Sequence, residues 1–167
     1  MATVEITIRR PALEDAPALA ALHGAAWRSA YRGIIPGVTL ERMIARRGPD
    51  FWRQMQGRGG ALILEFDGTA AGYAVTGPNR VRQPGAEGEI YELYLGPEYQ
   101  GAGLGRRLFQ ASREELRRAA RRGMVVRSLA MNENACGFYA AMGGRRLGRG
   151  SERIDGTKLA TVTYHWR

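Results

Sequence analysis

The sequence has few of the residues from which proteins build cross-links and metal centres. Its 167 residues include one cysteine, Cys136, and two histidines, His23 and His165. One cysteine cannot form a disulfide within the chain, and these three residues are too few for a convincing structural zinc site. We therefore expect neither redox chemistry nor a bound metal, and we interpret all three side chains as structural.

Long apolar stretches are also missing. Apolar runs such as residues 61–64 are far shorter than the roughly 18–20 apolar residues that span a bilayer. Residues 1–8 alternate between polar and apolar types, as a strand does, and they lack the basic segment and long apolar run of a secretory signal. We expect no membrane partner and a cytoplasmic location.

Lysine is nearly absent, whereas arginine is abundant. Lys158 is the only lysine among 25 basic residues, which leaves 24 arginines, and with 16 acidic residues the formal net charge is +9. The arginines are spread from Arg9 to Arg167, without the aromatic-rich basic stripe that stacks single-stranded nucleic acids. We expect no nucleic acid partner, and a basic nucleic-acid-associated protein remains an alternative.

The apolar content is sufficient for one folded domain. Hydrophobic residues make up 44% of the sequence, and a chain of this length buries roughly 68–70% of its unfolded surface. It can therefore form a core without metals or disulfides. We expect a single domain over residues 1–167.

Hydrophobic periodicity and turn residues predict the elements of this domain. Strands are expected at residues 3–9, 61–66, 70–76, 89–95, 124–130, 145–153 and 158–166. Helices are expected at residues 13–31, 38–46, 104–122 and 132–142, and the second can resume at 49–56. The order β-α-α-β-β-β-α-β-α-β-β describes an α/β fold with flanking helices and a mixed, mostly antiparallel sheet that contains one crossover.

A glycine-rich turn joins the strand at 89–95 to the helix that follows it. Its residues are Gln100, Gly101, Ala102, Gly103, Leu104, Gly105 and Arg106. Glycine lets a ligand approach the backbone, and the first turn of a helix has N–H groups without intrahelical partners, so this turn is a candidate phosphate cradle. Its spacing fits neither a P-loop nor a dinucleotide fingerprint. A turn that needs glycine only for packing is the alternative.

Two blocks around this turn resemble a known family. Residues 93–105, LYLGPEYQGAGLG, resemble the acetyl-CoA-binding motif of the GCN5-related N-acetyltransferase (GNAT) superfamily, with Gln100, Gly103 and Gly105 at its fixed positions. Residues 132–144, NENACGFYAAMGG, are similar to the family's N-x-x-A-x-x-F-Y-x-x-x-G-F and depart from it at Gly144, where an aromatic is usual. Residues 31–36, YRGIIP, resemble one bacterial branch, and the likeness covers nearly the whole chain.

The resemblance implies a GNAT-like fold and an enzyme that moves an acetyl group from acetyl-CoA, as co-substrate, directly to an amine. It also implies that the strand at 89–95 separates from the strand at 124–130 and that the cofactor enters the gap. The implied cofactor-binding residues are Leu93, Tyr94, Leu95, Gln100, Gly101, Ala102, Gly103, Leu104, Gly105, Arg106 and Asn132. Asn132 would also cap the helix it precedes, and capping alone explains it equally well.

Two side chains are candidates for proton transfer. Tyr139 matches the family's tyrosine that donates to the CoA sulfur, and a core aromatic is the alternative interpretation. Glu89 matches the catalytic glutamate of histone-acetylating relatives and is the preferred base. Glu92 is the alternative base, although strand alternation predicts that it points to the opposite face. A water relay would need neither glutamate.

The sequence says least about the acceptor, the amine that would receive the acetyl group. The resemblance implies a pocket built from Trp27, Tyr31, Ile34 and Ile35 and closed by the carboxyl-terminal hairpin, and these residues could equally be core. We expect a small-molecule or peptide amine, because the net charge of +9 would repel a polycation. An acetyl-CoA-binding regulatory module without turnover remains an alternative, and the sequence leaves open whether the protein is a homodimer.

Overall fold

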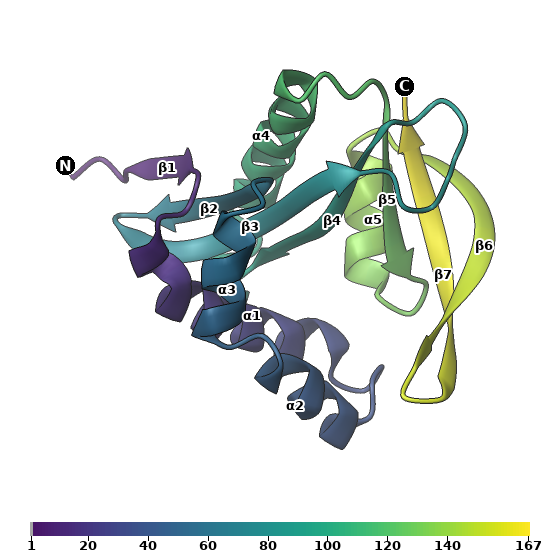
Figure 1. The fold of residues 1–167 in the computed structure, drawn as a ribbon, viewed down its shortest axis with the longest axis horizontal. Coiled ribbons are helices and arrows are strands. Elements are labelled where there is room, and N and C mark those ends of the chain that lie inside the picture. The colour runs from purple at the N-terminus through teal and green to yellow at the C-terminus, as the bar shows by residue number, and fades with distance from the viewer. Residues whose placement is uncertain (1) are drawn as a thin grey trace.

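The computed structural model describes residues 2–167. The strands are β1 (Ile6–Arg9), β2 (Ala61–Phe66), β3 (Thr69–Pro78), β4 (Gly88–Leu95), β5 (Met124–Leu129), β6 (Arg145–Ile154) and β7 (Thr157–Trp166). The helices are α1 (Ala16–Tyr31), α2 (Gly37–Ala45), α3 (Pro49–Gln56), α4 (Leu104–Arg118) and α5 (Glu133–Ala141), with short 3-10 turns η1 (Leu13–Asp15) and η2 (Pro97–Tyr99). Figure 1 shows how these elements are arranged.

The strands form one seven-stranded sheet in the order β1-β2-β3-β4-β5-β7-β6. Every neighbouring pair is antiparallel except β4 and β5, which are parallel and joined by the crossover through α4. The predicted fold class, an α/β domain with a mixed, mostly antiparallel sheet, is confirmed. None of the helices in residues 2–167 is both long and apolar enough to cross a membrane.

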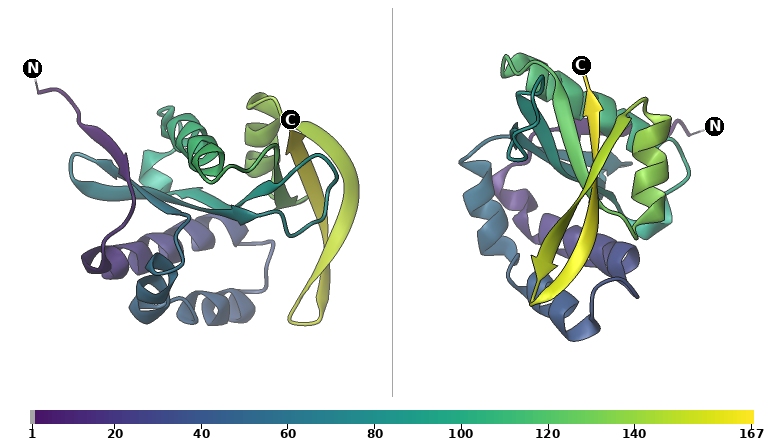
Figure 2. Two further views of the ribbon diagram at one scale, coloured as in Figure 1. Left: turned by 45° about the horizontal axis from the view of Figure 1, so that its top comes forward. Right: turned by 90° about the vertical axis from the view of Figure 1, so that its right-hand side faces the viewer.

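Helices cover both faces of the sheet, α1 to α3 on one side and α4 and α5 on the other (Figure 2). On the first face, Leu19 of α1 and Trp52 of α3 pack with Ile63 of β2. On the second, Leu108 of α4 packs with Leu64. Neighbouring residues of β2 point to opposite faces, so both faces need apolar side chains, and this explains the continuous apolar run of this strand.

The sheet opens between β4 and β5. The two strands pair at three positions only, from Gly88 opposite Met124 to Ile90 opposite Val126. Beyond these positions β4 continues to Leu95 and β5 to Leu129 without pairing to each other. The separation of these strands, which the family resemblance implies, is confirmed.

The hairpin of β6 and β7 curves from the edge of the sheet toward α2 (Figure 2). Arg42 of α2 and Asp155 at the hairpin tip form an ion pair of 3.1 Å. Ile154 and Leu159 pack against a buried cluster that includes Trp27. The hairpin thereby borders the face of the sheet that α1 and α2 cover.

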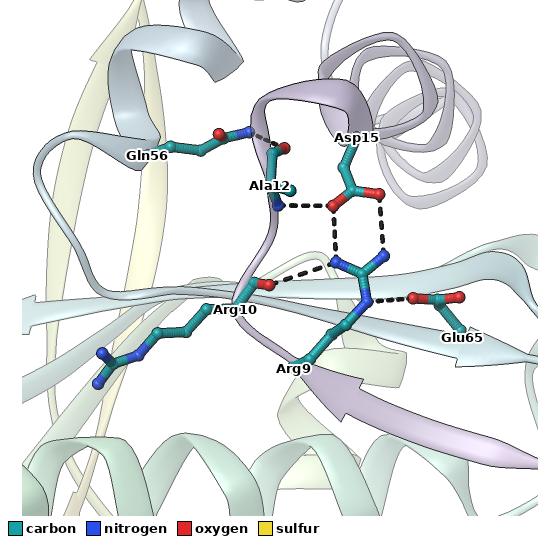
Figure 3. A network of polar contacts seen from close by, with 6 residues as sticks. All are labelled: Arg9, Arg10, Ala12, Asp15, Gln56 and Glu65. Carbon is teal, nitrogen blue, oxygen red and sulfur yellow. Dashed lines mark hydrogen bonds and ion pairs between the residues drawn. The ribbon is translucent and has the colours of Figure 1, made fainter.

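A polar network fixes the entry into α1 (Figure 3). The Arg9 guanidinium donates to both carboxylate oxygens of Asp15, at 2.7 and 2.9 Å, and to Glu65 of β2 at 2.5 Å. Gln56, the last residue of α3, donates to the carbonyl of Ala12 at 2.6 Å. The hydrogen bond from Arg9 holds the pKa of Asp15 below its usual range. This network ties β1, β2 and α3 to the start of the first helix.

The observed elements depart from the predicted ones mainly at their ends. β1 begins at Ile6 rather than residue 3, and the predicted helix at 13–31 begins as the separate 3-10 turn η1. Pro17 in the first turn of α1 suits this start, because its missing N–H has no helical partner there. The helical stretch that could resume at 49–56 does so as α3.

Candidate active site

A cavity of about 810 Å³ lies where β4 and β5 separate, and both layers of the molecule contribute to its walls. Nine of the side chains singled out from the sequence line it: Trp27, Tyr31, Ile35, Glu89, Glu92, Leu93, Tyr94, Asn132 and Tyr139. The structure therefore brings residues from α1, β4 and α5, from the loop before α2 and from the N-cap of α5 to one place. Their separation along the chain exceeds a hundred residues.

The remaining predicted residues lie outside this cavity. Ile34 packs beside it, in the cluster of Trp27 and Ile35, without lining it. The side chain of Leu95 packs with α4 on the other face of the sheet. The turn from Gln100 to Arg106 lies at the start of α4 and also does not line the cavity.

The glycine turn presents backbone donors to open space. Gly101 and Gly103 have positive φ angles of 82° and 76°, and Gly103 caps α4 without a side-chain hydrogen bond. The next three N–H groups, at residues 104–106, belong to the first helical turn and so have no intrahelical partner. A Cβ at Gly103 would meet no atom within 4 Å. This arrangement fits a phosphate at a helix N-terminus.

A β-bulge at Tyr91 changes which way the glutamates of β4 point. Glu89 lies opposite Gly77 and Glu92 lies opposite Val75, so Tyr91 is an extra residue in the pairing with β3. Gly77 and Val75 are two residues apart and share a face, the one on which Val75 packs against α1 and α3. The expectation that Glu92 faces away from Glu89 is wrong, because the bulge interrupts strand alternation.

Local contacts hold the bulge in place. The Tyr91 hydroxyl donates to the carbonyl of Pro78 at 2.6 Å, and the Arg80 guanidinium lies 3.7 Å from the centre of the Tyr91 ring. A Cβ at Gly77 would lie 2.5 Å from the same hydroxyl. Only glycine at this position leaves room for the bulged tyrosine.

Glu89 is buried with one carboxylate oxygen free. Its side chain is 1% exposed, and Oε2 accepts a hydrogen bond from Nε of Arg80 at 2.6 Å. Oε1 is buried and has no hydrogen-bond partner among residues 2–167. Burial raises the pKa of Glu89, and the hydrogen bond from Arg80 partly opposes this shift. Glu89 therefore combines a raised pKa with an unused acceptor atom.

Glu92 has both oxygens engaged. Nη1 of Arg47 donates to them at 2.5 and 2.6 Å, and the Tyr73 hydroxyl donates to Oε1 at 3.3 Å. The Arg47 guanidinium lies 4.9 Å from the centre of the Trp27 ring and 5.0 Å from that of Phe51. This carboxylate thus forms part of a rigid polar cluster under α1 and α3.

Tyr139 reaches the cavity from α5, on the other side of the sheet. Its side chain is 6% exposed and packs among aromatic rings that include Phe109, Tyr164 and Trp166. Burial raises its pKa, so the hydroxyl stays protonated at neutral pH. No hydrogen bond found in residues 2–167 involves this hydroxyl. Tyr139 therefore supplies an unused donor at the cavity wall.

Further hydroxyls line the cavity between these groups. Tyr31 and Tyr94 are hydrogen-bonded to each other through their hydroxyls. Burial raises the pKa of Tyr31 to about 12 and raises that of Tyr94 as well, so both are neutral. Asn132 accepts a hydrogen bond from the Ala135 N–H at 3.3 Å, which confirms its predicted role as the N-cap of α5.

Several polar residues at the cavity were not predicted from the sequence. Arg47, Arg80 and Glu152 line it, and Tyr73 donates to Glu92 from behind the lining. Arg47 and Glu92 are 45 residues apart, and no local pattern marks such a pair before the fold is known. In the part of the chain that the structure describes, no three His, Cys, Asp or Glu side chains form a group that could hold a metal ion.

Comparison with known proteins agrees with this geometry. Residues 25–143 match the Acetyltransferase (GNAT) family, so the chain belongs to this family and is an acetyl-CoA-dependent N-acetyltransferase. It is 31% identical over 161 residues to the uncharacterized N-acetyltransferase YuaI of Bacillus subtilis. The matched region covers 96% of this chain and 92% of YuaI.

Two further proteins are similar to this chain. It is 36% identical over 99 residues to the N-alpha-acetyltransferase RimI of Mycobacterium tuberculosis. The matched region covers 57% of this chain and 59% of RimI. The crystal structure of the PaiA N-acetyltransferase of Thermoplasma acidophilum, in complex with coenzyme A, has a TM-score of 0.73 at 19% identity and covers 95% of this chain and 98% of that one. The last likeness concerns the fold.

Proposed function

We propose that the gap between β4 and β5 binds acetyl-CoA and that acetyl transfer to the amine takes place in the adjoining cavity. The observation that carries this proposal is the end of β4–β5 pairing after Ile90, which leaves the β5-facing edge of β4 free up to Leu95. A free strand edge can pair with the amides of a pantetheine arm. The N–H groups of residues 101–106 can hold the pyrophosphate.

Tyr139 and Glu89 are the proposed proton donor and acceptor. Acetyl-CoA supplies the acetyl group, and the bond from its carbonyl carbon to sulfur breaks as the bond to the amine nitrogen forms. Tyr139 gives its hydroxyl proton to the departing thiolate, and Glu89 takes the proton that the amine loses. The free Oε1 of Glu89 favours this residue over Glu92, whose two oxygens are bonded to Arg47.

The acceptor amine is proposed to enter from the side of α1 to α3. Trp27, Tyr31 and Ile35 line that part of the cavity, and Ile34 supports them from behind. A small-molecule amine or a peptide amino group fits this opening, and the name of RimI, an N-alpha-acetyltransferase, favours testing α-amines first. A cytoplasmic location is proposed because the co-substrate acetyl-CoA is made and used there.

Ligand-dependent melting and turnover test the proposal together. Acetyl-CoA at a hundred times its dissociation constant should stabilise the protein by about 2.7 kcal/mol, whereas ATP and NAD should do little. With acetyl-CoA present, free thiol should be released by at least one acceptor in a screen of amino acids, short peptides, polyamines and aminoglycosides. A melt shifted by ATP but not by acetyl-CoA would contradict the proposed site.

A further inference from the structure

The charges that line the cavity are unbalanced. Seven arginines and four glutamates line it, and the lining contains no other charged side chain. They are Arg10, Arg47, Arg58, Arg80, Arg118, Arg121 and Arg127, with Glu89, Glu92, Glu115 and Glu152. The walls therefore carry an excess of three positive charges, which favours a ligand with an anionic group.

Each glutamate of the lining already has an arginine partner. The pairs are Glu89 with Arg80 at 2.6 Å, Glu92 with Arg47 at 2.5 Å, Glu115 with Arg10 at 3.2 Å and Glu152 with Arg127 at 3.9 Å. A second ammonium group on the acceptor would therefore find no carboxylate that lacks a cation. This arrangement disfavours polyamines.

Arg47, in contrast, has hydrogen-bonding capacity left. Its Nη1 donates to Glu92, and no hydrogen bond within residues 2–167 uses its Nε or Nη2. The side chain is 27% exposed and lines the cavity. The Nε and Nη2 atoms form one edge of the planar guanidinium, and this two-donor edge matches the two oxygens of a carboxylate.

The orientation of this guanidinium is fixed by its surroundings. The ring centres of Trp27 and Phe51 lie 4.9 and 5.0 Å from the guanidinium carbon, and Glu92 accepts hydrogen bonds from Nη1. The indole N–H of Trp52 donates to the Arg47 carbonyl at 3.1 Å and so anchors the backbone. A ligand would therefore meet an arginine that loses little side-chain freedom on binding.

We propose that the Nε–Nη2 edge of Arg47 binds a carboxylate of the acceptor, and that the enzyme acetylates amines that carry an acidic group, such as amino acids or short acidic peptides. This inference rests on the proposed function, because it places the acceptor in the same cavity. Arg47 then determines specificity: it holds the acidic end of the acceptor while the amine is directed to Glu89.

Matched pairs of acceptors test the proposal. Each free amino acid is compared with its carboxamide, and a short peptide with acidic residues is compared with its Asn and Gln counterpart. The acids should have kcat/KM values at least about tenfold higher, as expected for hydrogen bonds to a charged group. The comparison is stringent, because an amino acid amide has the less basic amine and presents more free amine at neutral pH.

Variants of Arg47 show whether this residue is responsible. Arg47→Lys keeps the charge but lacks the two-donor edge, so the ratio of kcat/KM for acid over amide should fall toward one. Arg47→Gln combined with Glu92→Gln removes the ion pair without leaving a lone charge, and it should lower the same ratio. The control Arg53→Gln removes an exposed arginine of α3 that pairs with Asp50, and it should keep the wild-type ratio.

The ratio separates recognition from structural damage, because a poorly folded variant loses both activities in proportion. Amides used as well as acids, a preference for spermidine-like amines, or an unchanged ratio in Arg47→Lys would overturn the inference and leave acetyl transfer intact. No acetylation of any amine would overturn the proposed function and this inference with it.

Discussion

Tyr139 and Glu89 approach the cavity from opposite layers of the molecule. Tyr139 comes from α5, and Glu89 faces the side of α1 and α3. Burial raises the pKa of both groups. The same physical cause keeps the tyrosine protonated and brings the carboxylate closer to the pH at which a base works best.

The role of Tyr139 can be tested by removing one oxygen atom. In Tyr139→Phe, kcat should fall by about 100-fold while the affinity for acetyl-CoA changes little, because the hydroxyl acts mainly when charge develops on sulfur. Steady-state kinetics and calorimetry measure the two quantities. Tyr164→Phe removes a hydroxyl from the same buried cluster and should keep the wild-type kcat. Wild-type turnover in Tyr139→Phe would make Tyr139 a core residue only.

The role of Glu89 can be tested through pH. A base must be ionised to accept a proton, so kcat should fall as the pH drops through the pKa of Glu89, which lies above its ordinary value of 4.5. In Glu89→Gln this acid limb should disappear, and kcat should fall by about 100-fold or more. The measurement is the pH dependence of kcat in both proteins.

Glu92→Gln is the matched control on the same face of the strand. It should keep the acid limb, because Glu92 is proposed to position Arg47 rather than to accept the proton. If Glu92→Gln loses the limb and Glu89→Gln keeps it, Glu92 is the base. If both variants keep it, ordered water carries the proton.

Two short backbone features shape the site, and the sequence predicted one of them. Glycines at fixed spacing marked the turn before α4, because they permit the positive φ angles found at Gly101 and Gly103. The bulge at Tyr91 was missed, because one extra residue leaves the apolar pattern of β4 nearly unchanged. Its effect appears only in the pairing with β3.

Features of the fold that depend on residues close in sequence could be predicted, whereas contacts that depend on tertiary structure could not. The strands on either side of Asp67 and Asp155 and the cap at Asn132 depend on residues close in sequence, and the predictions of these strands and of the cap are confirmed. The contact of Arg47 with Glu92 depends on how α3 docks on the sheet. Such pairs require the tertiary structure, and no spacing in the chain indicates them.

The glycine turn can be tested with two equivalent substitutions. Gly103 and Gly68 have φ angles of 76° and 77°, and a Cβ at either would meet open space. Alanine should therefore cost each about 1 kcal/mol of folding free energy. Only Gly103→Ala places a methyl group at the proposed pyrophosphate site, so only this variant should bind acetyl-CoA about tenfold more weakly. Equal affinities by calorimetry would contradict the cradle.

The stability of the whole molecule depends on His23, a buried group whose ionisation opposes folding in the acidic range. His23 of α1 is fully buried against Trp27, Trp52 and Tyr73, and neither ring nitrogen has a hydrogen-bond partner in the part of the chain that the structure describes. Burial, with smaller contributions from Arg47 and Arg28, lowers its pKa from 6.5 to about 3. The ring is therefore neutral in the folded state at all moderately acidic pH values.

This histidine makes stability depend on pH. Between pH 6.5 and about 3 the unfolded chain binds a proton at His23 that the native state does not, so the free energy of unfolding falls as the pH drops through this window. The loss should be on the order of 2 kcal/mol at pH 5 and absent above pH 7. His23→Leu should remove it. Urea melts give the free energy of unfolding of both proteins at pH 5 and pH 8. A difference between wild type and His23→Leu that is the same at both pH values would contradict this account.

Hydrogen exchange measured with and without acetyl-CoA tests most directly whether the gap between β4 and β5 is the cofactor site. Amide groups of residues 91–95 that face the gap, and those of residues 101–106, should exchange more slowly when acetyl-CoA is bound, because the ligand supplies partners that they lack in the free protein. Amides of β6, at the far edge of the sheet, should be unaffected. Slower exchange confined to α1, α2 and α3, with residues 91–95 and 101–106 unchanged, would contradict the account.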